Sequence, residues 1–481
     1  MPIFNFDNSY KKLSDKFYYQ VNPSTVPDPE LLLLNKDLAD ELDLEINTDE
    51  DLVEILSGNK IAKGSEPLAQ AYAGHQFGHF TMLGDGRAVL LGEHLSISGK
   101  RFDIQLKGSG QTPFSRRGDG KAALKPMLRE YLISEAMHAL NIPTSRSLAV
   151  VKTGEKIYRE TILEGAVLTR IMSSHIRVGT FEFARYYGGI DEVKELMNYT
   201  IHRHFRELKD AVNPALALLE KVMDLQMDLV VNWMRIGFIH GVMNTDNTSI
   251  PGETFDYGPC AFMGNYNPDT VFSSIDQNGR YRFGNQSNII KWNLARFAET
   301  LLPLLNPDEK KALEMATEKI NEFDENFSQK WWEMMWSKLG IQQPKEGDDL
   351  LVNELLQLME AQQKDYTNTF NFLRMPEILD ENKFFLNEKF EPWILKWQQR
   401  ISNEEGGKSQ AFEIMKSNNP ILIPRNLHVE KALDKAKKGD LSLMKSLLNL
   451  TKNPYEYHPE MQEFLYSDES FDSQYMTFCG T

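Results

Sequence analysis

Residues 240–247 read HGVMNTDN, and the triplet DYG follows at residues 256–258. This polar segment comes directly after residues 215–238, a long run that is apolar at helical spacing. Asparagine and aspartate offer the hard oxygen ligands that Mg²⁺ prefers beside phosphates. The same residue types also form simple turns. The segment therefore indicates either a turn or a metal-binding loop, and the features around it decide between them.

The spacing within this loop is typical of a nucleotide site. A protein kinase catalytic loop reads H-R-D-L-x-x-x-x-N and is followed by D-F-G. With His240 aligned on the histidine, Asn247 takes the place of the metal-binding asparagine and Asp256 that of the D-F-G aspartate. Val242 then replaces the catalytic aspartate, and valine cannot accept a proton. Asp246 is the nearest substitute, so the loop predicts either a dead enzyme or chemistry with a displaced base.

A strand and a helix upstream supply matching parts. In DIQLK, residues 103–107, alternation places Lys107 on the face opposite the apolar side chains. A lysine that ends a strand after a Gly-rich hairpin is where a kinase holds phosphates, and it needs a carboxylate partner. Glu130, on a helix expected from about residue 124 to 140, is the candidate partner, and Glu135 competes with it. Solvated surface positions are the alternative for all three charges.

Two Gly-rich segments are further candidates for phosphate contacts. LGDGR, residues 83–87, lies between two β-like runs, where glycines let the backbone approach a phosphate. A hairpin turn explains the same residues. In QTPFSRRGDGKAA, residues 111–123, basic residues and glycines surround Asp119. This segment suits a phosphate or a ribose, and its composition slightly favours an exposed turn.

Two arginines follow in LTRIMSSHIRVG. If this stretch is helical, Arg170 and Arg177 lie about two turns apart and point the same way. Two converging guanidinium groups suit a phosphate tail. A surface pair is the alternative.

The chain order predicts an α+β fold with a β-rich lobe, a helical lobe and terminal extensions. Residues 31–44, LLLLNKDLADELDL, are expected to be helical, and strands are expected at residues 147–154 and within 156–172. The expected division is an N-terminal extension over 1–60, a β-rich lobe over 61–165, a helical lobe with the catalytic and DYG loops over 166–340, and a helical C-terminal extension with a Cys-containing tail over 341–481.

The composition limits the classes of partner. The 481 residues include 53 Lys and Arg against 69 Asp and Glu, a formal net charge of −16. That balance disfavours broad binding to nucleic acid or to anionic membranes. No apolar stretch of about 18 residues predicts a membrane span. The N-terminus predicts no export signal, so a cytoplasmic protein is expected, with a monomer as the default.

The motifs together resemble the SelO family (selenoprotein O, also called YdiU) of kinase-like protein adenylyltransferases. The resemblance runs from about residue 70 to 435, and its motifs are long and specific. It is carried by AGHQFGHF, LGDGRA, DIQLKGSGQTPFSRRGDGKAALKPMLREYLISEAMHALNIPTSRSLAVV, RIMSSHIRVGTFEFA, GFIHGVMNTDNTSIPGETFDYGPCAFM, FGNQSNIIKWNLARFA and IPRNLHVEKAL.

The resemblance implies a protein-kinase-like two-lobed fold that binds ATP flipped relative to kinases, with Mg²⁺ or Mn²⁺. AMP then passes to Ser, Thr or Tyr hydroxyls of proteins. Asp246 resembles the catalytic base, Asn247 and Asp256 the metal ligands, and Glu130 the partner of the lysine. The positions that resemble nucleotide contacts are Gly84, Gly86, Arg87, Lys107, Asp119, Gly120, Arg170, Arg177 and Asp256.

The two cysteines, Cys260 and Cys479, are too few for a disulfide scaffold or a zinc site. Vertebrate members of the family have selenocysteine third from the end, where this chain has Cys479. The hypothesis is that the two cysteines pair under oxidising stress and pin the tail over the active site. Two free thiols are the alternative. For the chain as a whole, a phosphoryl-transferring kinase and an ATP-binding pseudokinase scaffold remain alternatives to AMP transfer.

Overall fold

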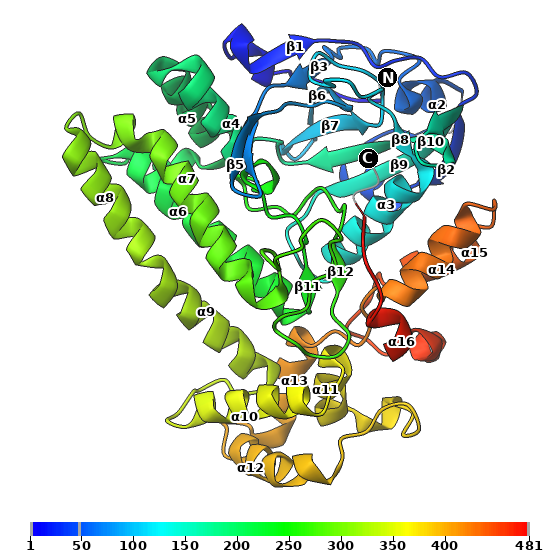
Figure 1. Ribbon diagram of the computed structural model, residues 1–481, viewed down its shortest axis with the longest axis vertical. Helices are drawn as coiled ribbons and strands as arrows, with labels where there is room; N and C mark the ends of the chain where they lie inside the picture. The colour runs from blue at the N-terminus through cyan, green and yellow to red at the C-terminus, as the bar shows by residue number, and fades with distance from the viewer. Residues whose placement is uncertain (1–2, 47–49, 479–481) are drawn as a thin grey trace.

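The computed structural model describes residues 3–46 and 50–478, which form a β-rich part and a larger helical part (Figure 1). The mixed α/β class agrees with the prediction. The strands are β1 Tyr18–Gln20, β2 Glu30–Leu34, β3 Leu68–Gln70, β4 Ala73–Gln76, β5 His79–Met82, β6 Ala88–Leu95, β7 Arg101–Lys107, β8 Ala122–Ala123, β9 Arg146–Tyr158, β10 Ile162–Met172, β11 Phe238–Ile239 and β12 Ala261–Phe262.

The helices are α1 Lys36–Glu41, α2 Glu50–Ser57, α3 Leu124–Ala139, α4 Val178–Phe183, α5 Ile190–His204, α6 Pro214–Arg235, α7 Gln286–Leu305, α8 Glu309–Asn321, α9 Phe323–Lys338, α10 Asp348–Ala361, α11 Tyr366–Arg374, α12 Glu391–Ser402, α13 Gly407–Asn418, α14 Asn426–Ala436, α15 Ser442–Leu450 and α16 Glu469–Asp472. No helix within the described residues is long and apolar enough to cross a membrane.

The main sheet has the strand order β1-β3-β6-β7-β10-β9-β2, with β8 paired to β10, and its pairs are antiparallel. One face carries Ile104 and Leu106, which pack with the N-terminal segment in a core of their own. The opposite face packs on α3, where Leu128 and Leu132 are fully buried. The period-2 alternation therefore places Lys107 on the α3 face, as the sequence predicts.

The N-terminal segment is part of this sheet. β1 pairs with β3, and β2 pairs with β9. The expectation of a helix over residues 31–44 is wrong for its first half, because Leu31–Leu34 lie in β2 and only Lys36–Glu41 are helical. A run of four leucines suits a buried strand as well as a helix, and its pairing partner β9 lies more than a hundred residues away.

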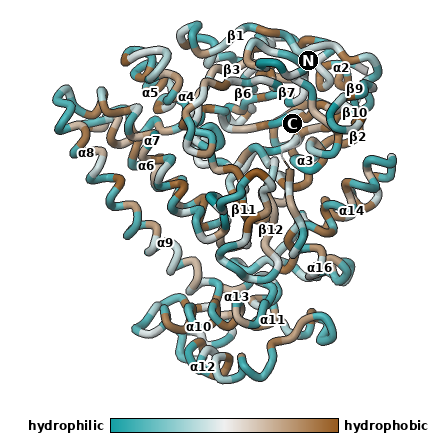
Figure 2. The backbone as a smooth tube through the Cα atoms, in the orientation of Figure 1, coloured by the Kyte–Doolittle hydropathy of each residue, from teal (hydrophilic) through white to brown (hydrophobic). Residues whose placement is uncertain are grey.

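Helices α6 and α7 support the polar loop in the middle of the molecule. Asn213 caps α6 by accepting a hydrogen bond from the Leu216 amide, and Pro214 occupies its first turn. Figure 2 shows hydrophobic stretches along α6 and near β11. The short ribbon of β11 and β12 follows, and it brings residues 240–247 and 256–258 to the same end of the sheet.

Candidate active site

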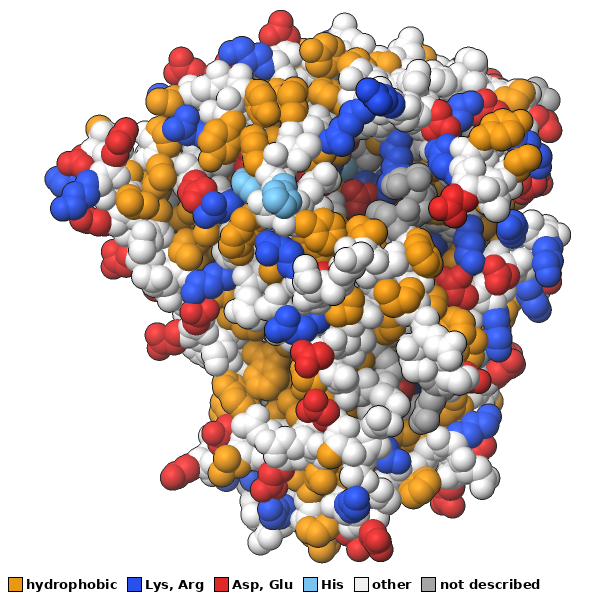
Figure 3. All heavy atoms as spheres, in the orientation of Figure 1, with side chains coloured by type: hydrophobic (Ala, Val, Ile, Leu, Met, Phe, Trp, Pro, Cys, Tyr) orange, Lys and Arg blue, Asp and Glu red, His pale blue; other side chains and the backbone are white. Residues whose placement is uncertain are grey.

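A cavity of about 530 Å³ opens between the sheet and the polar loop. In Figure 3, basic side chains stand around a hollow below the β-rich part, and acidic side chains lie within it. The lining carries more basic groups than acidic ones, although the whole chain is acidic, so the cavity suits an anion. The charged lining residues are Arg87, Lys107, Arg116, Lys121, Arg159, Arg170 and Arg177, with Asp85, Asp119, Asp246 and Asp256.

Four charged side chains form a cluster at the floor of this cavity. Lys107 Nζ lies 2.6 Å from Glu130 Oε2, and it also contacts the Asp256 carboxylate. Arg170 contacts the same two acids, with Nε 2.8 Å from Glu130 Oε1 and Nη2 2.5 Å from Asp256 Oδ1. Glu135, the competing candidate, instead pairs with Arg146 at 2.8 Å. Lys107 therefore has the helix glutamate beside it that a phosphate-binding lysine needs.

The cluster holds its acids ionised. Burial alone would raise the pKa of Asp256, but the charges of Arg170 and Lys107 outweigh it and hold the pKa well below its usual range. The same two cations outweigh the burial of Glu130 and lower its pKa. Both acids are therefore ionised at neutral pH, and the Asp256 side chain keeps 28% of its surface exposed.

Arg170 and Arg177 both line the cavity, but not through a shared helix. Arg170 lies in β10, and Arg177 is the N-cap residue of α4. The helical premise is therefore wrong, because residues up to Met172 pair with β7 and β9 instead. The Arg177 guanidinium lies 4.1 Å above the Tyr72 ring, and its Nη1 donates to Asp246 O at 3.1 Å.

Asp246 is a buried carboxylate of the cavity lining that has no salt bridge within the described residues. It is 8% exposed, and its Oδ1 has no hydrogen-bond partner in the described part of the chain. Burial raises its pKa to about 6, with the charge of Arg177 opposing. A carboxylate with such a pKa is largely ionised at neutral pH and still basic enough to take a proton.

The loop around Asp246 is fixed by the residues that flank it. His240 is buried, and its Nε2 lies 3.1 Å from Phe255 O, which ties the loop to the segment before Asp256. The Asn247 amide nitrogen donates to Val242 O at 3.0 Å, so the side chain is fixed through its donor and keeps Oδ1 as an acceptor. Val242 and Asn247 both line the cavity beside Asp246.

Gly84 and Gly86 line the cavity, and the structure gives a packing reason for each. A Cβ on Gly84, whose φ is +138°, would lie 2.3 Å from the Phe114 ring. A Cβ on Gly86 would lie 2.9 Å from the Phe114 carbonyl oxygen. Both glycines admit the segment that carries Asp119, because bulkier residues would push Phe114 away.

The segment of Asp119 and Gly120 also lines the cavity. Both Asp119 carboxylate oxygens accept bonds of 2.9 Å from Arg159, and the pKa of Asp119 is lowered by this contact despite partial burial. The pair ties residues 111–123 to the end of the β9–β10 hairpin, so this segment is held to the sheet.

Sequence reasoning missed Asp85 as a lining residue. Burial raises its pKa to about 6, with Arg177 opposing, and its Oδ2 accepts from the Gln70 amide at 3.1 Å and from Gln105 Nε2 at 3.3 Å. It stands between Gly84 and Gly86, and a carboxylate between two glycines was the available signal. No sequence pattern points to Tyr72 as a lining residue, because its neighbours in the sequence are small residues.

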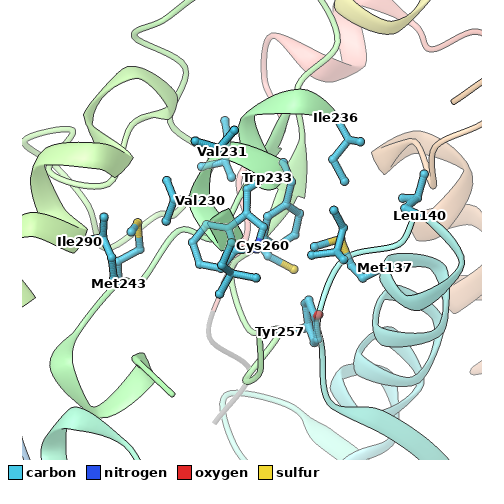
Figure 4. Packing of buried hydrophobic residues seen from close by; sticks show 14 of the residues in the cluster. Met137, Leu140, Val230, Val231, Trp233, Ile236, Met243, Tyr257, Cys260 and Ile290 are labelled. Carbon is cyan, nitrogen blue, oxygen red and sulfur yellow. The ribbon is translucent and has the colours of Figure 1, made fainter. Parts of the chain in front are cut away.

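Cys260 is fully buried among apolar side chains, as Figure 4 shows beside Trp233 and Met137. Burial raises the pKa of the Cys260 thiol to about 11, with Arg129 opposing, so the thiolate is scarce at neutral pH. Cys479, its predicted partner, lies outside the described residues.

Comparison with known proteins places this site in a family. A family model described as protein adenylyltransferase SelO matches residues 3–452. The chain belongs to the SelO family. A protein nucleotidyltransferase YdiU of Pelagibacter ubique is 52% identical over 480 residues, and one of Geobacillus kaustophilus is 53% identical over 481; each match covers 99% of both chains. The resemblance inferred from the motifs is confirmed, and with it the prediction that this SelO-family chain is an enzyme of the nucleotidyltransferase class.

Proposed function

We propose that this SelO-family enzyme transfers AMP from ATP to Ser, Thr or Tyr hydroxyls of acceptor proteins and releases pyrophosphate. The observation that carries the proposal is the position of Asp246. It supplies a buried, ionisable carboxylate to the cavity beside Val242, which is where a kinase would place its base. The family and its relatives, which are named as protein nucleotidyltransferases, support the same class of reaction.

ATP is bound with its phosphates reversed relative to a kinase. Lys107 offers an ammonium group and Arg170 a guanidinium group at the cavity floor. Arg177 adds a second guanidinium group beside Asp246. Such a cluster neutralises the charge that builds on a departing pyrophosphate. The β- and γ-phosphates therefore bind at this cluster, and the α-phosphate faces the acceptor.

The chemical step needs one base. The acceptor hydroxyl oxygen forms a bond to the α-phosphorus while the bond from that phosphorus to the bridging oxygen of the β-phosphate breaks. The electron pair of that bond leaves with pyrophosphate, and the hydroxyl proton passes to the Asp246 carboxylate. Burial of Asp246 serves this step, because a pKa of about 6 is closer to neutrality than that of an ordinary aspartate.

Asn247 and Asp256 are the residues that would hold Mg²⁺ or Mn²⁺. Their amide and carboxylate oxygens suit either hard cation, and both residues line the cavity, where the Asp256 side chain is partly exposed. Within residues 3–46 and 50–478 no three His, Cys, Asp or Glu side chains group into a metal site, so phosphate oxygens would complete the coordination. When bound, the cation supplies charge neutralisation at the phosphates.

The division of the chain follows from this assignment. Residues 61–165 correspond to a kinase-like N-lobe and residues 166–340 to a C-lobe, with extensions over 1–60 and 341–481. Support comes from the order of the parts: Lys107 ends a central strand, Glu130 lies on the one long helix that covers the sheet, and the loops with Asp246 and Asp256 follow.

Redox control through Cys260 and Cys479 is the last part of the proposal. Because Cys260 is buried with a raised pKa, its oxidation requires the apolar packing around it to open first. Thiol trapping during oxidant treatment tests this. Protection of Cys260 and Cys479 together, with loss of transfer, supports the pairing, and two trappable thiols with unchanged transfer contradict it.

The proposed reaction is tested by the mass gained by an acceptor protein incubated with the enzyme, ATP and Mg²⁺. A gain of one AMP, absent with Asp246→Asn, is the expected result. A gain of one phosphate makes the protein a kinase, and ATP binding without any gain favours the scaffold alternative. Matched binding of ATP by both proteins excludes a folding defect in the variant.

A further inference from the structure

The β4–β5 hairpin, residues 73–82, stands at the edge of the cavity and belongs to a separate two-stranded sheet. Its sequence, AGHQFGHFTM, lacks a role in nucleotide or metal binding as assigned above. Its turn is formed by Phe77 and Gly78, which have φ values of 51° and 87°. Gln76 and Phe77 line the cavity, so the tip of this hairpin reaches the reacting groups.

Three successive hairpin residues bond to three successive residues of the catalytic loop. The His75 amide donates to Thr245 Oγ1 at 2.7 Å, and the Phe77 amide donates to Asn244 Oδ1 at 3.1 Å. Between them, Gln76 Nε2 lies 3.5 Å from Asp246 Oδ2. The hairpin therefore holds the loop at residues 244–246 through hydrogen bonds, and the Gln76 side chain contacts the Asp246 carboxylate.

A buried acid, Glu182, links the hairpin and the loop to helix α4. Thr245 Oγ1, which accepts from the His75 amide, donates to Glu182 Oε2 at 2.6 Å, and the other Glu182 oxygen contacts His75 Nδ1. Glu182 lies in α4 and is 1% exposed. Hairpin, loop and helix are thus joined through hydrogen bonds to one buried carboxylate, which opposes rotation of the residue next to Asp246.

Gly74 makes room for Asp246. A Cβ on Gly74 would lie 2.5 Å from Asp246 Oδ1 and 2.9 Å from its Cβ, closer than real contacts. Gly74 does not have a left-handed φ, so backbone conformation does not demand glycine there. The missing side chain is a slot that the Asp246 carboxylate fills.

We infer that the β4–β5 hairpin positions Asp246 for proton transfer: Gly74 supplies the slot in which Oδ1 is buried, and Gln76, which lines the cavity, contacts Oδ2. The inference rests on the proposed function for the role of Asp246. Because Oδ1 is enclosed by the hairpin, Oδ2 is the oxygen that remains to take the hydroxyl proton. Gly74 and Gln76 are positioning residues, since they act through Asp246.

Variants of the hairpin in the full chain test this inference through transfer rates and ATP affinity. Gly74→Ala must displace the carboxylate, so kcat should fall about 100-fold or more, as loss of a general base does, with ATP affinity retained. His79→Ala is the matched control, because His79 is exposed, pairs opposite Gln76 and lies outside the cavity lining. It should transfer AMP at the wild-type rate.

Gln76 has a separate readout in the split between kcat and ATP affinity. Gln76→Ala removes the side chain that lies 3.5 Å from Asp246 Oδ2, so kcat should fall while ATP affinity stays at the wild-type value. Gln76→Glu keeps the shape but replaces the donor with a second carboxylate, so its kcat should fall at least as far. If Gln76 acted by shape alone, Gln76→Glu would restore the wild-type kcat, and the inference would be wrong.

The failure of this inference is distinguishable from the failure of the proposed function. A wild-type enzyme that transfers AMP, together with a Gly74→Ala variant of equal kcat, overturns the positioning role and leaves the function intact. A wild-type enzyme that transfers no AMP overturns the function. In that case a crystal structure of Gly74→Ala decides the positioning: a displaced Asp246 carboxylate supports the slot, and an unmoved one contradicts it.

Discussion

Among the described residues, two of the buried clusters of charge on this sheet can be compared, and one of them faces the cavity. The cavity cluster consists of Lys107, Glu130, Arg170 and Asp256. The closed cluster consists of Glu93, Asp103, His175 and Arg203, where Arg203 Nη2 lies 2.6 Å from Asp103 and Nη1 lies 3.1 Å from Glu93.

The closed cluster has the marks of a structural network. Its carboxylates are 1% exposed, and Glu93 also accepts from Ser9, which ties the N-terminal segment to the sheet. Burial would raise the pKa of Asp103, but Arg203 and His175 reverse this and lower it, while burial lowers the pKa of His175 to about 4. The cavity cluster differs in its partly exposed Asp256 and in its neighbour Asp246, whose Oδ1 has no partner in the described chain. His175 Nε2 in the closed cluster also has no hydrogen-bond partner in the described chain, so neither buried charge nor an unsatisfied polar atom alone marks a site; the side open to the cavity does.

The largest expected effect is on the AMP transfer rate, at Asp246 beside the cavity cluster. Asp246→Asn keeps the shape of the side chain but cannot accept the proton, so the AMP transfer rate should fall roughly 10²- to 10⁴-fold. ATP affinity, measured by calorimetry, should remain, because Lys107, Arg170 and Arg177 are unchanged. Transfer at the wild-type rate would mean that another group is the base.

The closed cluster should respond in stability instead. Arg203→Met leaves Asp103 and Glu93 buried without their main cation, which should cost about 3–5 kcal/mol of unfolding free energy in denaturant titrations. Arg170→Met is the matched variant in the cavity cluster, and it should also weaken ATP binding. Comparable losses of ATP affinity in the two folded variants would erase the distinction between the clusters.

Much of this arrangement is readable from local sequence patterns. Helix α3 is expected at residues 124–140 and is found at Leu124–Ala139, and alternation in β7 places Lys107 on the α3 face. The loop spacing picks out Asp246, Asn247 and Asp256, and all three line the cavity. These features depend on neighbours within a few residues, so the sequence specifies them directly.

The features that sequence patterns do not give depend on distant pairing. Leu31–Leu34 form β2 because β9 offers a partner more than a hundred residues away. Gln76 gives no signal of its own, since its contact with Asp246 spans 170 residues. Polar residues brought to a site by long-range packing look like surface residues in the sequence.

An effect of intermediate size is expected in the pH dependence of the unfolding free energy, again at Asp246. The pKa of Asp246, about 6 in the fold against about 3.8 in the unfolded chain, means that ionisation at neutral pH disfavours the folded state. Asp246→Asn should therefore raise the unfolding free energy by about 3 kcal/mol at pH 7. The gain should shrink as the pH falls from 6 towards 4, where Asp246 is protonated. Unfolding measured across this range checks the sign, and a gain that grows on acidification would contradict it.

The smallest effect is expected from ion pairs that are largely exposed to solvent. Lys310 and Glu314 lie 3.9 Å apart on α8 with side chains 86% and 65% exposed. Lys310→Ala should change the unfolding free energy by no more than about 0.5 kcal/mol. A thermal melt of this variant sets the baseline for the two buried clusters, and a loss as large as that of Arg203→Met would undo the ranking by burial.

The most direct test of the account follows which phosphate of ATP stays on the acceptor. The enzyme is incubated with Mg²⁺, an acceptor protein and ATP labelled at either the α- or the γ-phosphate. Label from the α-phosphate alone, lost with Asp246→Asn, is the predicted result, because the account places the α-phosphorus beside Asp246. Label from the γ-phosphate alone would contradict both the reversed nucleotide and the role of Asp246.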